Sequence, residues 1–297
     1  MLLRAGDKTF DLTTKALIVG IVNATPDSFS DQDPKGIEHA EKRAAELAGQ
    51  GADVIEVGGE SNVSNRPAVD AAEEIERVTP AVAAAAETGL TVAIDTYKPA
   101  VARAAIEAGA TIVNDISGLG DPDMHEVVAE SGAAAVLMHT ETPPKQVRWE
   151  EDLYPDGLAT HMKRFFERRL EALADAGVSA EQVALDPGPD FAKTPRQTVE
   201  ALRALREVAE LDRPVYLAVS RKDFIGALTH TRPSERGPGT FAALASGLLS
   251  CGRLLRVHDV VGTRRFLTIW EALNDPEIDI PVDLRIDDAV RREQGDA

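Results

Sequence analysis

Eight short apolar runs alternate along this chain with eight longer segments whose apolar residues recur at a helical period. Each run is rich in β-branched residues and is followed by polar, turn-forming residues, as buried parallel strands are. Strands that alternate with helices, without a block of strands alone, are typical of a parallel barrel. The sequence therefore predicts the α/β class and a single (β/α)8 TIM barrel.

The expected strands are 16–23, 53–59, 92–96, 112–117, 134–139, 183–188, 214–220 and 254–259, and the expected helices are 36–50, 70–87, 98–109, 121–131, 156–177, 195–209, 238–252 and 261–274. Gly109 and Gly177 fall where helices end, and Pro99, Pro122 and Pro195 lie near helix starts. A doubly wound open sheet is the main alternative, because eight units can also be arranged that way. No Gly-x-Gly-x-x-Gly turn follows any strand, which weakens its dinucleotide-binding version.

We expect three parts along the chain. Residues 1–15, with Gly6-Asp7-Lys8 between two short alternating stretches, are expected to form an N-terminal hairpin. Residues 16–274 form the barrel, and no linker or shift in composition divides them. Residues 275–297 are rich in Asp, Pro and Arg and are expected to be a loosely held C-terminal tail.

Composition limits the kinds of partner that the chain can bind and indicates its cellular compartment. The net charge of −18 argues against nucleic acid and anionic membranes as partners, although local Arg and Lys side chains can still bind a small anion. Cys251 is the only cysteine, so a disulfide within the chain or a cysteine-based metal site is excluded. We see no charged-then-apolar leader and no apolar run near the roughly 18 residues of a spanning helix, so we expect a cytoplasmic location.

Polar side chains close almost every expected strand, and in a barrel such residues converge on one mouth. Leaving so many polar groups buried without partners would cost about 1–3 kcal/mol each. One of them alone, such as Asp95, could simply cap the next helix. The whole set predicts an active site and comprises Asn23, Glu60, Ser61, Asp95, Thr96, Asn114, Asp115, Met138, His139, Asp186, Ser220, Arg221, Lys222, Arg256 and His258.

The chemistry of this set divides in two. Carboxylates, an amide and an ammonium suit a flat heterocycle with adjacent N–H donors and a carbonyl, and they are supplied by Asp95, Asn114, Asp186 and Lys222. Asn23, Arg256 and His258 suit a polyanion, because Arg and His donate to phosphate oxygens and Asn can reach a metal or a phosphate. A ring at one end and phosphates at the other describe a pterin or nucleotide pyrophosphate.

Eight segments in order match one known family, and they are Ile21-Val-Asn-Ala-Thr-Pro-Asp-Ser-Phe-Ser-Asp31, Asp53-Val-Ile-Glu-Val-Gly-Gly-Glu-Ser61, Ile94-Asp-Thr96, Asn114-Asp-Ile-Ser-Gly118, Leu137-Met-His139, Leu185-Asp-Pro-Gly188, Ser220-Arg-Lys222 and Arg256-Val-His-Asp259. From about residue 16 to 272 the chain resembles the dihydropteroate synthases. The resemblance implies a homodimeric transferase of folate biosynthesis. It condenses 6-hydroxymethyl-7,8-dihydropterin pyrophosphate with p-aminobenzoate, releases pyrophosphate and uses Mg2+.

The resemblance also implies roles for particular residues. The pterin would be bound by Asp95, Asn114, Met138, Asp186, Phe191 and Lys222. The pyrophosphate would be held by Asn23, Arg256 and His258, with Asn23 near the metal ion. The p-aminobenzoate would be contacted by Ser220, Arg66 and Pro67, and the residues with catalytic roles would be Asp27, Arg66 and Lys222.

The chain departs from the usual family pattern in loops near the second substrate. The second loop reads Gly59-Glu-Ser-Asn-Val-Ser-Asn-Arg-Pro-Ala68, so the usual Thr-Arg pair is absent at 62 and 63, and Arg66-Pro67 stands three residues later. The first loop has Gln32-Asp33-Pro34 where a Gly-Gly pair is usual. After the fifth strand, His139-Thr-Glu-Thr142 replaces a turn that contains Met and Gly. In the sixth loop, Asp190-Phe-Ala-Lys193 lacks the usual glycines.

Two other functions remain open at this point. One is a non-catalytic paralogue that binds the pterin pyrophosphate but has an altered p-aminobenzoate site. The other is a corrinoid-linked methyltransferase with a similar barrel. The segments Ser220-Arg-Lys222 and Arg256-Val-His258 argue against the methyltransferase, because methyl transfer has no pyrophosphate to hold.

Overall fold

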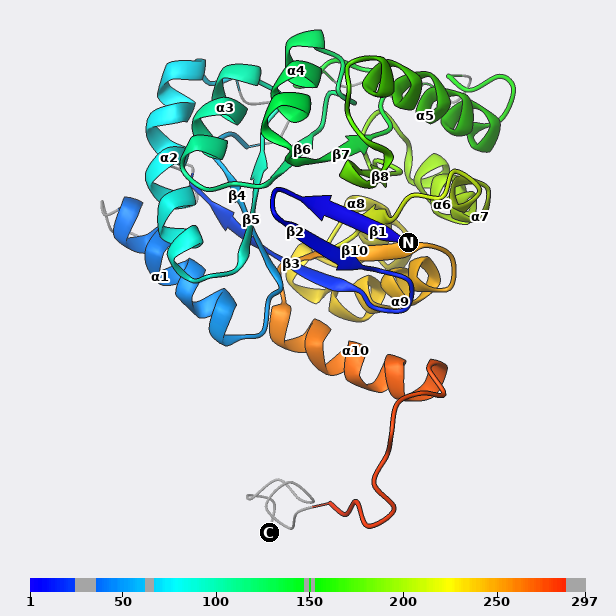
Figure 1. The fold of residues 1–297 in the computed structure, drawn as a ribbon. Coiled ribbons are helices and arrows are strands. Elements are labelled where there is room, and N and C mark those ends of the chain that lie inside the picture. The colour runs from blue at the N-terminus through cyan, green and yellow to red at the C-terminus, as the bar shows by residue number, and fades with distance from the viewer. Residues whose placement is uncertain (25–35, 62–66, 147–149, 151–152, 287–297) are drawn as a thin grey trace.

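The computed structural model describes residues 1–24, 36–61, 67–146, 150 and 153–286. Within these residues the chain forms a closed barrel of parallel strands surrounded by helices (Figure 1). The order of strands around the barrel is β10-β3-β4-β5-β6-β7-β8-β9, so the last strand closes on the first. The predicted (β/α)8 barrel is confirmed, and the open doubly wound sheet is wrong.

An antiparallel hairpin of β1 (Leu2–Ala5) and β2 (Lys8–Asp11) precedes the barrel, as expected. The barrel strands are β3 (Leu17–Asn23), β4 (Val54–Gly58), β5 (Thr91–Asp95), β6 (Ile112–Asp115), β7 (Ala134–Met138), β8 (Val183–Asp186), β9 (Val215–Leu217) and β10 (Gly252–Val257). The helices are α1 (Gly36–Gly49), α2 (Ala71–Glu87), α3 (Pro99–Glu107), α4 (Pro122–Ser131), α5 (Leu158–Asp175), α6 (Pro195–Arg203), α7 (Leu205–Ala209), α8 (Asp223–Thr229), α9 (Gly237–Leu248) and α10 (Val260–Asn274).

The structure differs from the sequence prediction mainly around β9. The helix expected at 195–209 is two helices, α6 and α7, which meet at Ala204. The strand expected at 214–220 ends at Leu217, because the chain then turns through Arg221, whose φ is 58°. Helix α8 was not expected, since seven residues are too few to show a helical period.

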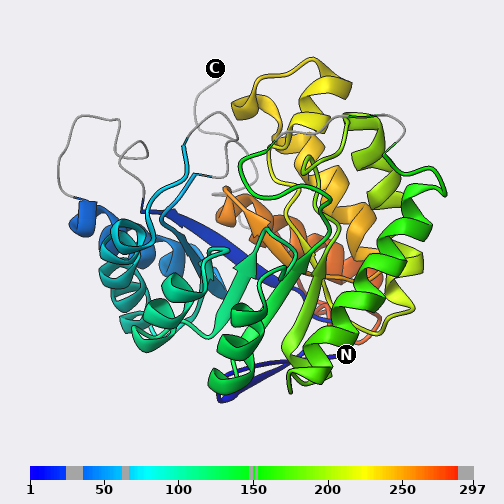
Figure 2. The same ribbon diagram turned by 90° about the horizontal axis from the view of Figure 1, so that it is seen from above.

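The end of the barrel at which the strands begin is apolar and is closed by the hairpin. Leu3, Ala5 and Leu12 are at most 1% exposed. They form one buried cluster with the interior residues Val19, Val54, Ala93, Ile112, Ala134, Val136, Ala184, Tyr216, Ala218 and Leu254. In Figure 2 the strand arrows point away from the hairpin, which lies at the end of the barrel where the strands begin. The carboxyl ends of the strands are therefore left for a binding site.

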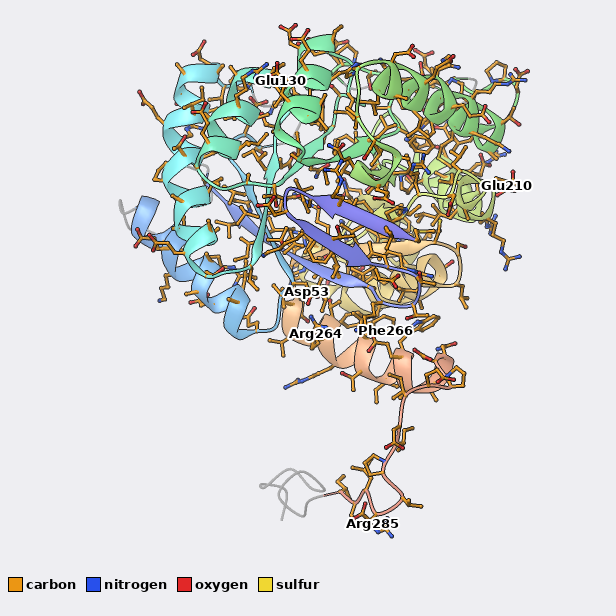
Figure 3. All side chains as sticks on the ribbon, viewed as in Figure 1. Asp53, Glu130, Glu210, Arg264, Phe266 and Arg285 are labelled. Atoms are coloured by element: carbon orange, nitrogen blue, oxygen red, sulfur yellow. The ribbon has the colours of Figure 1, made fainter. Side chains whose placement is uncertain are left out.

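An ion pair joins the last helix to the start of β4. The Arg264 Nη2 donates to Asp53 Oδ2 at 2.7 Å, and Arg264 Nε donates to the Gly51 carbonyl at 3.2 Å (Figure 3). Asp53 Oδ2 also accepts the backbone N–H of Ile18 at 2.8 Å. These contacts connect the first and last β/α units where the barrel closes.

Within the residues that the structure describes, none of the helices combines the length and the apolar character needed to cross a bilayer.

The hairpin offers a matched test of barrel stability. Leu3→Ala removes a side chain that is 1% exposed, and we expect it to lower the free energy of unfolding by about 2–4 kcal/mol through the cavity it leaves. Leu2→Ala changes the neighbouring side chain, which is 42% exposed, and should change it by less than about 0.5 kcal/mol. Urea unfolding followed by circular dichroism measures both, and equal effects would contradict the hairpin's role in the core.

Candidate active site

Strand alternation explains why polar side chains gather inside the barrel mouth. Successive side chains of a strand point to opposite faces, so residues two apart share a face. Ala93, Ile112, Ala184 and Leu254 belong to the interior cluster. Two positions further along the same strands, toward the carboxyl ends, stand Asp95, Asn114, Asp186 and Arg256. These four side chains therefore face the interior, one layer above the apolar core.

Glu56 lies at the centre of this polar layer. Its carboxylate is 1% exposed and accepts hydrogen bonds from Asn114 Nδ2 at 3.0 Å, from the Tyr216 hydroxyl and from Arg256 Nε. Glu56 thus connects β4 with β6, β9 and β10. The sequence prediction missed Glu56. A single carboxylate at an interior-facing position of an otherwise apolar strand indicates a buried charge with polar partners, and this could have identified it.

Arg256 bridges two carboxylates. Besides Glu56, its Nη2 donates to Asp95 Oδ2 at 3.1 Å. Burial alone would lower the pKa of this guanidinium, but the Glu56 and Asp95 carboxylates raise it above the ordinary value, so Arg256 stays charged. Burial and then Glu56 also raise the pKa of Tyr216, which keeps its hydroxyl protonated as a donor.

Asp186, Phe191 and Lys222 lie together at the mouth. Asp186 is buried and accepts the Gly188 N–H at 2.7 Å; burial raises its pKa to about 6 against the opposing effects of that hydrogen bond and of Lys222. Lys222 Nζ lies 4.3 Å from the centre of the Phe191 ring. Burial lowers the pKa of Lys222, and the nearby carboxylates of Asp190, Asp186 and Asp95 oppose this. A charged edge thus adjoins an aromatic face.

Asn114 presents an acceptor into this layer. Its Nδ2 is used by Glu56, and its Oδ1 is buried with no hydrogen-bond partner among the described residues. A buried acceptor without a partner is costly unless a ligand donates to it. Met138, the last residue of β7, is 1% exposed and lies two residues beyond the interior-facing Val136. The layer can therefore accept N–H donors of a flat ring.

The polyanion half of the predicted site is more exposed. His258 Nδ1 and Ser220 Oγ are 2.9 Å apart, and the His258 backbone N–H also donates to Ser220 Oγ. Desolvation of its ring and the Arg256 charge lower the pKa of His258 below its ordinary value, so the imidazole is neutral at pH 7. Asn23 ends β3 with an exposed side chain. These groups lie at the carboxyl ends of β3, β9 and β10, which are neighbours in the barrel.

A network of charges holds the beginning of the second loop. Glu60 accepts from Lys98 Nζ at 2.6 Å, from the Val69 N–H at 2.9 Å and from the Tyr97 hydroxyl at 3.1 Å, and Lys145 Nζ lies 3.2 Å from it. Pro67 is exposed. Asp27 and Arg66, which were predicted to be catalytic, lie outside the described residues.

Lys193 links the loop that carries Phe191 to the residue that follows β7. Its buried ammonium donates to the carbonyls of His139 at 2.9 Å and of Gly188 and Phe191 at 3.1 Å each. Burial lowers its pKa to about 7. In the same loop Asp190 and Ala192 have φ values of 64° and 48°, a region that favours glycine. The loop thus holds two residues with side chains in left-handed backbone.

The comparisons with known proteins agree with this geometry. A profile of pterin binding enzymes matches residues 19–258. The dihydropteroate synthase of Clostridium beijerinckii is 38% identical over 268 residues, which cover 89% of this chain and 96% of that protein.

Two solved structures of Xanthomonas albilineans dihydropteroate synthase are similar to the whole barrel. The complex with 4-aminobenzoic acid is 35% identical with a TM-score of 0.84, over 93% of this chain and 99% of that one. The complex with 7,8-dihydropteroate is 35% identical with a TM-score of 0.81, over 92% and 99%. The chain therefore belongs to the pterin binding enzymes and, among them, to the dihydropteroate synthase family.

Proposed function

We propose that this chain is a working dihydropteroate synthase. It condenses 6-hydroxymethyl-7,8-dihydropterin pyrophosphate with p-aminobenzoate to give dihydropteroate and pyrophosphate. One observation carries this proposal beyond family membership: a buried layer of acceptors, Asp95, Asn114 and Asp186, adjoins Arg256 and Lys222 at one barrel mouth. A ligand with an N–H edge and a negative tail suits both parts at once.

In this proposal the pterin lies across the polar layer. The Asp186 carboxylate accepts ring N–H donors, the open Oδ1 of Asn114 accepts another, and Lys222 donates to a ring carbonyl or nitrogen. Asp95, on β5, accepts a hydrogen bond from the same edge of the pterin ring. Phe191 and Met138 pack against the faces of the ring. Hydrogen bonds from these donors favour the charged form of Asp186 and so offset the effect of burial on its pKa.

The pyrophosphate is assigned to Arg256, His258 and Asn23. Arg256 uses Nε and Nη2 on the two carboxylates, so its Nη1 donors are left for a phosphate oxygen. Ser220 engages His258 Nδ1, which leaves Nε2 for the same anion. A bound pyrophosphate would raise the pKa of this imidazole, because an opposite charge favours the protonated ring.

The metal ion of the family is proposed to be Mg2+, held in part by Asn23. Mg2+ commonly takes one or two protein oxygens and completes its octahedron with waters and substrate phosphates. The exposed amide of Asn23 at the end of β3 fits that limited role. When bound, the ion would supply charge stabilisation to the leaving pyrophosphate.

The chemistry requires no covalent intermediate with the protein. The C–O bond to the pyrophosphate breaks, the positive charge at the exocyclic methylene is shared with the pterin, and the amine of p-aminobenzoate attacks and then loses a proton. Arg256 and His258 stabilise the developing charge on the leaving group. We assign Asp27 to stabilisation of the cation, and Arg66, Pro67 and Ser220 to p-aminobenzoate.

The proposal extends to the oligomeric state and the cellular location of the protein. We propose a homodimer in the cytoplasm, with residues 16–274 as the catalytic unit, residues 1–15 as its closing hairpin and residues 275–297 as a tail. The free thiol of Cys251, buried against α7, is compatible with a reducing compartment.

The direct test is steady-state release of pyrophosphate with both substrates. Lys222→Ala should lower kcat/KM at least about 30-fold, equivalent to about 2 kcal/mol of transition-state binding, since it leaves buried carboxylates without their cation. Lys163→Ala removes a surface ion pair with Glu210 on the outer side of α5 and is the matched control, with unchanged activity expected.

Arg66→Ala separates the enzyme from a binding-only paralogue. It should raise KM for p-aminobenzoate without weakening binding of the pterin pyrophosphate. If wild-type protein binds the pterin pyrophosphate tightly but releases no pyrophosphate with p-aminobenzoate, the transferase proposal is wrong and the paralogue stands.

Asp186→Asn should abolish pterin binding and yet stabilise the free protein. The folded-state pKa of Asp186 is about 6, above its ordinary value of 3.8, so its contribution to stability is present below pH 4 and is lost as the pH rises through 6. Removing the charge should therefore raise the melting temperature at pH 7.5, by an amount worth about 3 kcal/mol, but not at pH 4. A pH-independent difference in scanning calorimetry would contradict the buried-charge explanation.

Arg256→Lys should weaken pyrophosphate binding more than pterin binding. Lysine keeps the positive charge beside Glu56 but loses the forked donors that reach a second partner. Isothermal titration with the hydroxymethylpterin alone and with its pyrophosphate measures both affinities. Equal losses for the two ligands would show that Arg256 acts on the ring half instead.

A further inference from the structure

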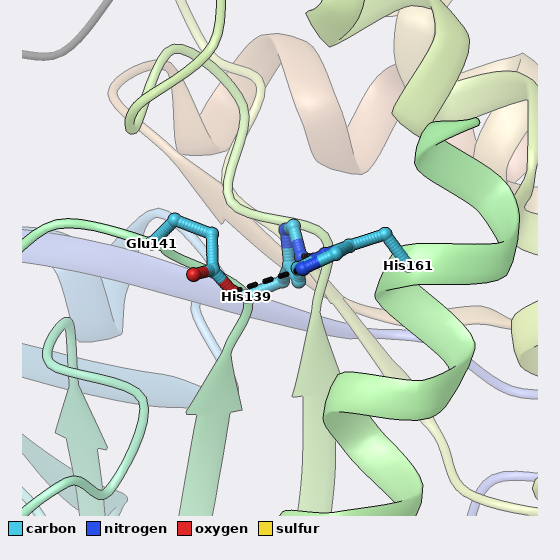
Figure 4. A group of neighbouring side chains, drawn as sticks. All are labelled: His139, Glu141 and His161. Carbon is cyan, nitrogen blue, oxygen red and sulfur yellow. Dashed lines mark hydrogen bonds and ion pairs between the residues drawn. The ribbon is translucent and has the colours of Figure 1, made fainter. Parts of the chain in front are cut away.

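Three metal-ligating side chains meet outside the barrel interior. His139 directly follows Met138 of β7, and by strand alternation it points away from the interior, toward the helices. His161 lies on α5, and Glu141 lies on the connection between β7 and α5. Figure 4 shows the three side chains converging from these elements. None of them belongs to the pterin, pyrophosphate or p-aminobenzoate groups described above.

The three side chains lie close enough together to bind one metal ion after a small rearrangement. His139 Nε2 and His161 Nδ1 are 3.1 Å apart, and His161 Nε2 lies 3.2 Å from Glu141 Oε1 (Figure 4). One ligand atom from each residue can be chosen so that all three lie within 4.8 Å of one another. Bonds of about 2.0–2.1 Å to a tetrahedral metal place ligand atoms a little over 3 Å apart. The two short distances involve different nitrogens of His161, and only one of them can bind the ion, so the His161 ring or Glu141 must turn to bring all three ligands onto one metal.

The surroundings fix the His139 imidazole, whereas His161 and Glu141 are partly exposed. His139 is fully buried, with the rings of Phe165 and Tyr154 centred 5.0 and 5.8 Å from its own. Its Nδ1 has no hydrogen-bond partner among the described residues, so its only polar link is through Nε2 to His161. The Glu141 side chain is 31% exposed.

The cluster can be reached from the side of Glu141. Glu141 and Thr140 line an open cavity of about 810 Å³ bounded by Phe165, Arg168 and Arg169 of α5. Water or a small anion from this cavity can complete a tetrahedral site. This is the arrangement of three protein ligands with one open position.

We propose that His139, Glu141 and His161 form a Zn2+ site that ties the start of the β7–α5 connection to α5. Lys193 and Arg168 place positive charge near His139, which opposes binding of any cation, so the Glu141 carboxylate and strong bonds to the imidazoles must offset it. Two imidazoles and one carboxylate suit Zn2+, whereas Mg2+ prefers an all-oxygen octahedron. The site is therefore chemically separate from the Mg2+ assigned to Asn23.

The site would also act on the mouth at a distance. Lys145, four residues after Glu141, has its Nζ 3.2 Å from Glu60 and also contacts the Ser61 carbonyl. Fixing Glu141 on the metal would restrict the connection that carries Lys145. The Zn2+ ion would thus stiffen the support of the second loop without touching substrate.

The test measures metal binding directly, on the full-length protein without substrates and in excess Mg2+. We expect one Zn2+ per chain by equilibrium dialysis, a rise in melting temperature on adding Zn2+, and a tetrahedral visible spectrum with Co2+. His161→Gln should weaken Zn2+ binding at least about 100-fold, and Glu141→Gln at least about 10-fold, with loss of the Zn2+-dependent shift in melting temperature. His230→Gln, which changes an exposed histidine at the end of α8, should bind Zn2+ like the wild type.

Glu141→Gln keeps the test valid if His161→Gln fails to fold, because Glu141 is partly exposed and near-isosteric with Gln. No stoichiometric Zn2+, or equal Zn2+ affinity in wild type and Glu141→Gln, would overturn the proposal. Because no substrate is present, either result is independent of the assay for dihydropteroate synthesis.

Discussion

The site depends on the carboxylate of Glu56, which is buried at the centre of the barrel mouth. It accepts from side chains on three other strands, β6, β9 and β10, and so connects opposite walls of the barrel. A buried ion pair contributes little net stability, because desolvating two charges offsets most of their attraction. Removing one partner, by contrast, leaves the other charge buried and unpaired, which is strongly destabilising. We infer that Glu56 and Arg256 serve to fix the position of Asn114 and Asp95 rather than to stabilise the barrel.

The same layer explains how an acidic chain can bind a strongly anionic substrate. The net charge of −18 is a property of the whole chain, and salt screens exposed charges that are more than about 10 Å apart. Arg256 and Lys222 are held in poorly solvated positions at the mouth, where their charges act over short distances with less screening. The neutral state of His258 limits repulsion among these cations until an anion arrives.

The alternation of strands with helices made most of the fold predictable, and the polar residues at the strand ends did the same for most of the inner site. Asp95, Asn114, Asp186 and Arg256 stand at strand ends, and strand ends in a parallel barrel share one mouth. Glu56 was overlooked because attention to strand ends leaves out the middle of a strand. Lys193 could not have been found in this way, since its three carbonyl acceptors come from two loops that only the folded chain brings together. Helix α8 is too short for a periodic signal.

The loop after β8 shows why a departure in sequence need not be a departure in structure. Left-handed backbone costs about 1 kcal/mol or more for a residue with a side chain, and here Asp190 and Ala192 both adopt it. The three hydrogen bonds from Lys193 hold this conformation, together with two bonds of Asp190: its N–H donates to Thr198 Oγ1, and its carboxylate accepts the N–H of Asp223. Because Asp223 begins α8 and Lys222 directly precedes it, the strained loop positions Phe191 and Lys222 together. Surrounding contacts thus hold Asp190 and Ala192 in a backbone that glycine adopts more readily, and the loop still brings Phe191 beside Lys222.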